Sequence, residues 1–146
     1  MNIAIASDHG GFVLKEEILK NFFKSKEFIF IDIGSFSLVS DDYPDFAKLV
    51  CDAVLSKKSD YGVLICTTGV GMSIAANRFK GIRAALCHSV ELAEQSREHL
   101  DANVLVLGRK QTSVKTAVEI TRVFLTTPFS KAERHVRRLN KIDCFC

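Results

Sequence analysis

The sequence predicts an α/β fold in which a parallel sheet is covered by helices on both faces. Short apolar runs rich in valine, isoleucine and leucine alternate with longer segments of helical period. The 146 residues, 47% of them hydrophobic and 25% charged, suit one globular domain with its own core, and no internal repeat or low-complexity linker interrupts them. We therefore expect a single domain over residues 1–146.

Each element follows from its local pattern. The short apolar runs predict strands at residues 3–7, 28–33, 62–66, 82–87 and 104–107. The segments between them predict helices at 12–23, 45–55, 70–78, 90–99 and 113–125, and a last, basic helix from 130 to about 141. In the first helix Leu14, Ile18 and Phe22 share one face, which leaves Lys15 and Lys20 outside. The longest irregular stretch, residues 34–44, is a strand-to-helix loop of a length that is often functional.

The charge balance limits the kinds of partner. A formal net charge of +3 and a pI near 8.6 are too mild to require a nucleic acid or a membrane surface, so we expect a small anionic ligand. The apolar run at 3–6 is too short for a signal peptide. No window approaches the roughly 18 apolar residues of a membrane span. We expect a cytoplasmic protein.

The five cysteines, at 51, 66, 87, 144 and 146, form an odd number without the paired spacing of a zinc site. A core this apolar does not need disulfides, so we expect reduced thiols and no metal. The terminal Cys144-Phe145-Cys146 does not form a prenylation signal, because that signal needs cysteine where Asp143 stands. A frayed tail is the simpler interpretation.

Polar side chains follow the predicted strands where a parallel sheet binds ligands, at the carboxyl ends. Asp8 and His9 follow the first strand and precede two glycines, Cys66 ends the third strand, and His88 follows the fourth. Asp8 has a structural alternative, which is to cap the first helix. His9 is equally consistent with a surface turn and with a position that contacts ligand.

The segment from Cys66 to Asn77 is the most informative part of the chain. Cys66 faces a turn in which the N–H groups of Gly69, Val70 and Gly71 precede any intrahelical acceptor. Such N–H groups favour negative charge, so the turn can activate a thiol, bind a phosphate or hold an oxyanion. An inert buried thiol is the alternative.

Other chemistries fit this segment poorly. A phosphatase loop needs arginine where Met72 stands, and the dinucleotide-binding fingerprint needs glycine where Ile74 stands. A Walker loop would need a G-K-[ST] ending, which is missing, and the histidines and cysteines lack metal spacing. A thiol facing an anion-stabilising turn remains.

Six motifs together give the chain a specific resemblance. They are S-D-H-G-G-F-x-L-K at 7–15, D-Y-P at 42–44, C-T-T-G-V-G-x-S-I-A-A-N at 66–77, G-I-R-A at 81–84, S-R-x-H at 96–99 and N-V-L-x-L-G at 103–108. Over nearly its whole length the chain resembles the type B ribose-5-phosphate isomerases of the ribose/galactose isomerase family. The resemblance implies a three-layer α/β/α, Rossmann-like fold with a five-stranded parallel sheet. It also implies a homodimer or tetramer whose active sites combine residues of two subunits, and no cofactor.

The resemblance further implies a reaction, the interconversion of ribose 5-phosphate and ribulose 5-phosphate through an enediolate, as in the pentose phosphate pathway. Such a reaction needs a base and an oxyanion site. Cys66 matches the family's base, and Thr68 matches the residue that assists the enediolate. His99 matches the residue that opens the sugar ring, with Asp8 assisting. On local pattern alone, His99 is a cation at a helix end.

Substrate binding is implied at further positions. Arg134 and Arg138, four residues apart and so on one helix face, match the family's phosphate arginines, which reach the neighbouring subunit's pocket. His9 matches a phosphate or ring-hydroxyl contact. Without the resemblance, the two arginines would be part of a solvated basic face. The other implied contacts are Asp8, Tyr43, Thr67, Gly69, Val70, Gly71, Asn77 and Leu100.

The chain departs from the family pattern at three positions. Thr67 stands where glycine is usual, so its backbone must have negative φ; Leu100 replaces an asparagine; and Lys110 replaces an arginine. Met72 stands where a sister branch carries a glutamate base, which places this chain in the cysteine branch. The loss of the amide at 100 predicts altered or weaker sugar selectivity. Two alternatives stay open: an isomerase of allose or galactose 6-phosphate, and a catalytically silent sugar-phosphate sensor.

Overall fold

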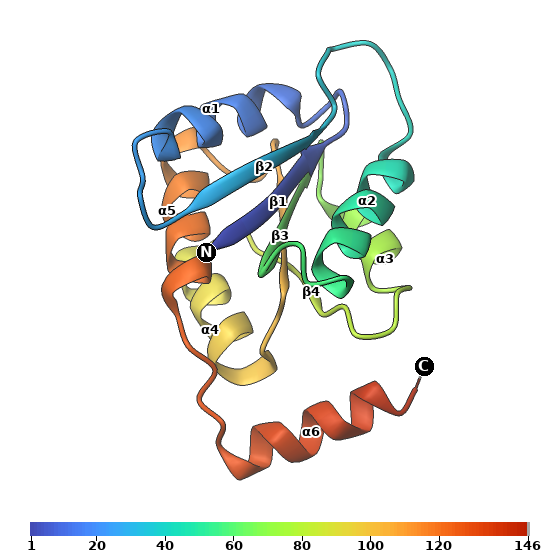
Figure 1. Cartoon of the computed structure of the whole chain (residues 1–146), viewed down its shortest axis with the longest axis vertical. Coiled ribbons are helices and arrows are strands. Elements are labelled where there is room, and N and C mark those ends of the chain that lie inside the picture. Colours follow the sequence, from blue (N-terminus) through green and yellow to red (C-terminus); the bar gives the residue numbers. More distant parts are fainter. Residues whose placement is uncertain (146) are drawn as a thin grey trace.

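The computed structural model describes residues 1–145 and has the predicted three-layer α/β/α architecture (Figure 1). Its sheet has the strand order β2-β1-β3-β5-β4, with parallel pairing throughout. The strands are β1 Asn2–Ser7, β2 Ile29–Gly34, β3 Tyr61–Cys66, β4 Ala84–Leu86 and β5 Val104–Gly108. One face is covered by α1 Phe12–Phe22, α4 Val90–Leu100 and α5 Val114–Thr126, and the other by α2 Tyr43–Leu55 and α3 Val70–Ala76.

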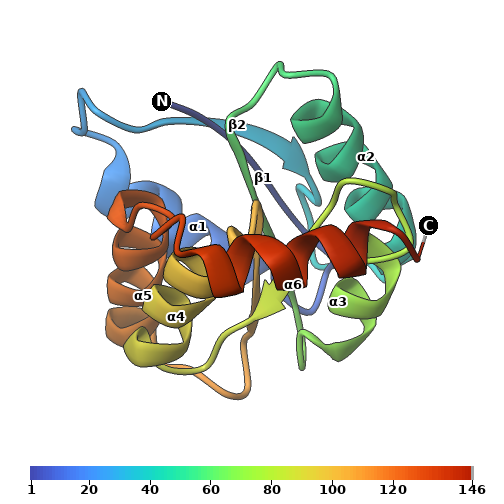
Figure 2. The ribbon, with the colours of Figure 1, turned by 90° about the horizontal axis from the view of Figure 1, so that it is seen from below.

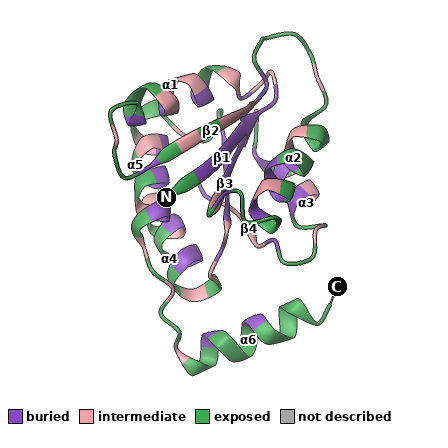
Figure 3. Cartoon of the chain, viewed as in Figure 1, coloured by how far each residue is buried: buried purple, intermediate pink, exposed green. Residues whose placement is uncertain are grey.

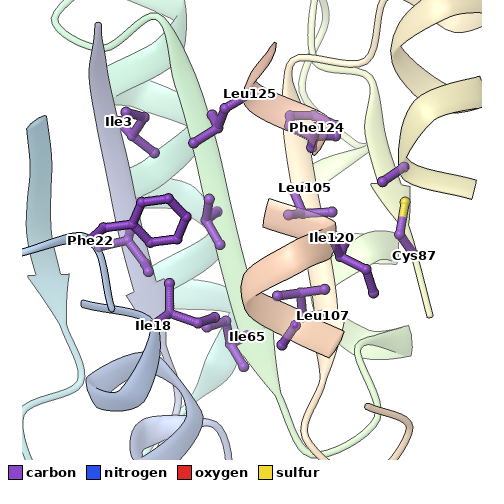
Figure 4. Close-up of a cluster of buried hydrophobic side chains, with 14 of the residues drawn as sticks. Ile3, Ile18, Phe22, Ile65, Cys87, Leu105, Leu107, Ile120, Phe124 and Leu125 are labelled. Atoms are coloured by element: carbon purple, nitrogen blue, oxygen red, sulfur yellow. The ribbon is translucent and has the colours of Figure 1, made fainter. Parts of the chain in front are cut away.

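The strands are buried on both faces, as their continuous apolar runs predict. In β1, Ile3 and Ile5 belong to the core under α1, α4 and α5, whereas Ala4 and Ala6 belong to the core under α2 and α3. Figure 3 shows the central strands as buried along most of their length, and Figure 4 shows the larger of the two cores. The two cores fix which way each strand faces, and so fix the edge at which its polar residues emerge.

Most elements differ from their predicted bounds by one or two residues, and three of the differences have a clear local cause. Helix α2 begins at Tyr43 because Pro44 fits the first turn of a helix, where its missing N–H is not needed. Strand β4 has only three residues, since the N–H of Ile82 turns back to the carbonyl of Phe79. The last helix, α6 Glu133–Asp143, begins later than predicted because Lys131, with φ of 55°, turns the chain ahead of it.

Helix α6 lies apart from the three layers and crosses the end of the sheet at which the strands begin (Figures 1 and 2). Among its residues His135 and Leu139, four apart, are buried. The predicted arginines Arg134 and Arg138 are therefore presented at the amino end of the sheet.

The described cysteines Cys51, Cys66, Cys87 and Cys144 are free thiols, as predicted. Cys146 lies outside the described residues, and with it the end of the predicted frayed tail. Within residues 1–145, none of the helices has the length and apolar character that crossing a membrane requires.

Lys15 is buried, and the prediction that it lies outside α1 is wrong. Its Nζ donates to both carboxylate oxygens of Asp32, at 2.7 and 2.6 Å, and to the carbonyl of Ser35 at 2.8 Å. The side chain of Lys15 is 0% exposed and that of Asp32 is 24% exposed. A helical wheel assigns a lysine to solvent, but the carboxylate at the end of β2 supplies the charge that makes burial possible. The contact fixes the start of the loop that follows β2.

We expect Lys15→Met to lower the free energy of unfolding by about 3 kcal/mol, the lower end for breaking a buried ion pair, because Asp32 keeps some exposure to water. Chemical denaturation measures this change. The matched control is Lys20→Met, which removes an exposed pair with Glu17 of 2.7 Å and is expected to cost less than about 1 kcal/mol. Equal losses for the two variants would contradict the assignment.

Candidate active site

The carboxyl ends of β1, β3 and β5 bring the first group of predicted site residues together. The N–H of Asp8 donates to the carbonyl of Ile65 at 3.2 Å, and the N–H of Arg109 donates to the carbonyl of Cys66 at 3.0 Å. These two bonds join the loops after the three strands into one rim. Asp8 and Cys66 thus lie on adjacent strands at the edge where parallel sheets bind ligands.

The sulfur of Cys66 faces the turn as predicted. The N–H of Gly69 donates to Sγ over 3.1 Å, and the cysteine is only 5% exposed. Gly69 has φ of 80°, and a Cβ there would stand 2.3 Å from a methyl carbon of Leu86, so the turn requires glycine. An N–H pointing at sulfur stabilises a thiolate.

The other predicted N–H donors are disposed differently. The N–H of Val70 donates to the Thr68 hydroxyl at 3.3 Å, so that hydroxyl is held at the start of α3. The first intrahelical bond of α3 runs from the N–H of Ser73 to the carbonyl of Gly69, so the N–H of Gly71 precedes it. Gly69 therefore serves the sulfur, while Val70 orients the hydroxyl of Thr68.

Asp8 shapes its own loop. Its Oδ1 accepts the N–H of Gly11 at 2.8 Å, and the residue is 7% exposed. Helix α1 has no side-chain cap of its own, so Asp8 braces the turn that leads into the helix and does not act as its N-cap. Its carboxylate stays on the same rim as Cys66.

Thr67 and Tyr43 line the rim closely. A Cβ on Gly10 would stand 2.2 Å from Oγ1 of Thr67, which shows that the threonine side chain lies over that glycine. Among the described non-glycine residues, only Lys57, Asp101 and Lys131 have positive φ, so Thr67 has the negative φ predicted for it. The ring of Tyr43 covers Gly71, where a Cβ would meet Cζ at 2.8 Å.

Asn77 lies at the other end of α3, away from the turn. Its amide donates to the carbonyls of Ser73 and Ala84 and accepts the N–H of Ala84, each at 2.9 Å. In this chain the side chain joins α3 to β4, and the structure does not bring it to Cys66.

Lys110, one of the departures, follows β5 next to a second cation. Its N–H donates to the carbonyl of Thr67 at 3.0 Å, and Nε of the preceding Arg109 donates to the carbonyl of Gly10 at 2.7 Å. Arg109 therefore places a guanidinium at this rim, one position before residue 110, where the family usually has its arginine.

The second group of predicted residues lies at the opposite, amino end of the sheet. Helix α4 runs back from the carboxyl edge, so His99 and Leu100 end it beside the segment that leads into β5 (Figure 1). A cavity of about 350 Å³ lies between α4, α6 and the edge strand β4, with His99, Leu100 and Arg138 among its lining residues. Arg134 is held beside this cavity by the neighbouring His135. Within one chain, the predicted site residues therefore lie in two separate groups, one at each end of the sheet.

His135, a residue that was not predicted from the sequence, lies between His99 and Arg134 in this second group. Its ring lies 4.4 Å from that of His99 between centroids, Nε2 accepts Nε–H of Arg134 at 3.2 Å, and Nδ1 lies 2.9 Å from Oγ of Ser130. Burial, helped by the electrostatic effect of Arg134, His99 and Arg138, lowers the pKa of His135. A signal existed in the sequence, since His135 shares the apolar stripe of Leu139 on an otherwise charged helix.

Comparisons with known proteins show the family to which the chain belongs. The profile of the family described as Ribose/Galactose Isomerase matches residues 3–142. Ribose-5-phosphate isomerase B of Escherichia coli is 41% identical over 140 residues, which cover 96% of this chain and 93% of the relative.

Solved structures are equally similar. A ribose 5-phosphate isomerase of Thermotoga maritima superimposes with a TM-score of 0.92 at 49% identity, covering 97% of both chains. Ribose-5-phosphate isomerase B of Mycoplasma genitalium, solved with bound ribulose-5-phosphate, gives a TM-score of 0.90 at 43% identity and covers 99% of this chain and 95% of that one. The chain belongs to the ribose/galactose isomerase family.

Proposed function

We propose that this chain is an aldose–ketose isomerase that interconverts D-ribose 5-phosphate and D-ribulose 5-phosphate. One observation carries the proposal: the Cys66 sulfur accepts the Gly69 N–H at the carboxyl edge of the sheet, next to Asp8. Relatives that share this family act on ribose 5-phosphate by name, and one was solved with the ketose bound.

The proposed chemistry is a proton transfer between adjacent sugar carbons. With the ring open, the Cys66 thiolate takes the proton from C2, and the electrons move to the C1 carbonyl oxygen to give an enediolate. Thr68 and the turn's N–H groups stabilise that oxygen. The thiol returns the proton to C1 while the proton of the C2 hydroxyl moves to the oxygen on C1, which leaves a carbonyl at C2. The reaction requires neither a metal nor an organic cofactor.

We propose that His99 and Asp8 open the ring and that Arg134 and Arg138 bind the phosphate, with His9 assisting. A planar guanidinium suits a phosphate, which carries about −1.5 to −2 charges near pH 7. Because His99 and the arginines lie at the amino end of their own sheet, they can meet Cys66 only in another subunit. A homodimer, or a tetramer built from two such dimers, supplies that arrangement.

The test is an assay of the purified chain on ribose 5-phosphate, allose 6-phosphate and galactose 6-phosphate. The proposal expects the highest kcat/KM with ribose 5-phosphate. A preference for either hexose phosphate would assign the chain to the hexose 6-phosphate isomerases. Tight binding of all three without turnover or exchange of the C2 proton would make it a sensor. We also propose a cytoplasmic location, because free thiols are typical of a reducing compartment.

Leu100 is proposed to limit sugar selectivity, since an apolar side chain stands where the family usually has an amide. Leu100→Asn restores one hydrogen bond to the sugar and is expected to raise kcat/KM for at least one pentose or hexose phosphate about tenfold. The matched control is Leu55→Asn: Leu55 is 41% exposed and Leu100 is 46% exposed, and Leu55 lies on α2, away from the cavity. Unchanged kcat/KM for every sugar phosphate would contradict the role of residue 100.

A further inference from the structure

His9 forms a close pair with Asp41, a residue of the loop between β2 and α2. The N–H of His9 donates to Oδ1 of Asp41 at 2.9 Å, and the ring Nδ1 lies 3.0 Å from the same oxygen. The N–H of Asp41 also points to Nδ1, over a longer 3.3 Å. The shorter contact assigns the proton to Nδ1. Of the two ring nitrogens of His9, Asp41 contacts only Nδ1, so Nε2 is the ring nitrogen that can face a ligand.

The loop that carries Asp41 is anchored at its start. The N–H of Ser35 donates to the carbonyl of Ser7 at 2.6 Å, and the carbonyl of Ser35 accepts Nζ of the buried Lys15 at 2.8 Å. These bonds tie the loop to the end of β1, from which Asp8 and His9 follow. These anchors hold the loop that brings the carboxylate of Asp41 next to His9.

Charged groups face His9 from each element around it. Asp8 precedes it on the β1 loop, Asp41 comes from the β2–α2 loop, and Arg109, after β5, donates to the carbonyl of Gly10, the next residue. The hydrogen bond to Asp41, followed by the negative charges of Asp8 and Asp41, raises the pKa of His9 despite partial desolvation. Hydrogen bonds from Ser35 and His9 lower the pKa of Asp41, although its own burial opposes this.

We propose that Asp41 is a positioning residue that holds His9 as an imidazolium, with Nε2–H available to donate to the substrate's phosphate. This inference rests on the proposed function, because it assigns His9 to the phosphate of that substrate. A charged donor forms a stronger bond to a phosphate oxygen than a neutral ring does. Asp41 therefore extends phosphate binding to the pH range in which an unassisted histidine is neutral.

The direction of the pH effect follows from the raised pKa. Wild-type His9 is charged below its raised pKa and loses its contribution to phosphate binding as pH rises through that value. In Asp41→Asn the ring loses its proton at lower pH, closer to the ordinary value of about 6.5. At pH 6 both proteins carry the charge, so their KM values for ribose 5-phosphate should be similar. As pH rises above that ordinary value, the variant's KM should rise before that of wild type and exceed it by up to about tenfold, with kcat nearly unchanged.

Two measurements test the inference. Steady-state kinetics from pH 6 to 8.5 compares wild type with Asp41→Asn, and with Asp45→Asn as a control of equal charge change on the first turn of α2. The same Asp41→Asn change in a His9→Asn background should have no further effect on KM. A ratio of KM values that does not change with pH, or a full Asp41 effect without His9, would overturn the inference.

Titration of the His9 ring by proton NMR is independent of turnover. The inference expects its pKa to be lower in Asp41→Asn than in wild type, and an unchanged pKa would overturn it even if ribose 5-phosphate is isomerised. If the pKa of His9 is lower in Asp41→Asn but the wild-type protein does not isomerise ribose 5-phosphate, the pairing of His9 with Asp41 stands and the proposed function is rejected. The binding of inorganic phosphate, measured by calorimetry at pH 6 and pH 8, should weaken in Asp41→Asn at the higher pH only.

Discussion

Cys66→Ser is expected to lower kcat for ribose 5-phosphate by about 10³-fold and to leave KM nearly unchanged. A serine hydroxyl fits the same space and can accept the Gly69 N–H, but it does not ionise near neutral pH and so provides no base. General-base catalysis contributes about 10² to 10⁴ in rate, which sets the size of the loss. Steady-state kinetics at neutral pH measures both constants. The substitution separates proton abstraction from substrate binding, because the turn and the phosphate site are untouched.

The matched control is Cys51→Ser, which changes a second buried thiol. Cys51 lies on α2, its Sγ faces the carbonyl of Ala76, and burial, helped by the charge of Asp52, raises its pKa to about 12. It remains a protonated thiol and is expected to be catalytically silent. If Cys66→Ser retained wild-type kcat, or if Cys51→Ser lost as much activity, the sulfur of Cys66 would not be the base.

Mixing two inactive variants is expected to restore activity, since the proposed site is divided between two subunits. Cys66→Ala disables the half at the carboxyl edge, and His99→Asn disables the half at the amino end. In a mixed dimer one site carries both lesions and the other carries none. With equal amounts and random pairing, about a quarter of the wild-type activity should return. The measurement is isomerase activity after the two variants are unfolded together and refolded, with each variant refolded alone as the control.

Complementation distinguishes a shared site from a site within one chain. If His99 acted on the Cys66 of its own chain, every site in a mixed dimer would carry one lesion, and no activity would return. That outcome would contradict the division of the site. It would also require α6 and the end of α4 to move from the amino end of the sheet to the carboxyl end.

The strands and the turn after Cys66 could be predicted from the sequence because their signals are local. The apolar runs of β1, β3 and β5 are continuous, as burial on both faces requires. The turn at Gly69 follows from a glycine between a strand and a helix. The place of Asp8 beside Cys66 follows from a general property of parallel sheets, in which carboxyl ends share one edge.

The features that could not be predicted depend on contacts between distant segments. Lys15 is assigned to solvent by helical periodicity, and only Asp32, on another element, explains its burial. Asp41 pairs with a histidine 32 positions earlier, and no spacing rule marks such a pair. The sequence also does not reveal that the end of α4 and the whole of α6 lie at the amino end of the sheet, away from Cys66; that separation is visible only in three dimensions.

The fate of the hydrogen at C2 is the most direct test of Cys66 as the group that moves it. Ribose 5-phosphate labelled with deuterium at C2 is incubated with wild type and with Cys66→Ser, and the label is followed by NMR. In wild type the deuterium should leave C2 as ribulose 5-phosphate forms, appearing at C1 or in water, whereas with the variant it should stay at C2 over the same time. Equally fast loss of the label with both proteins would contradict the account.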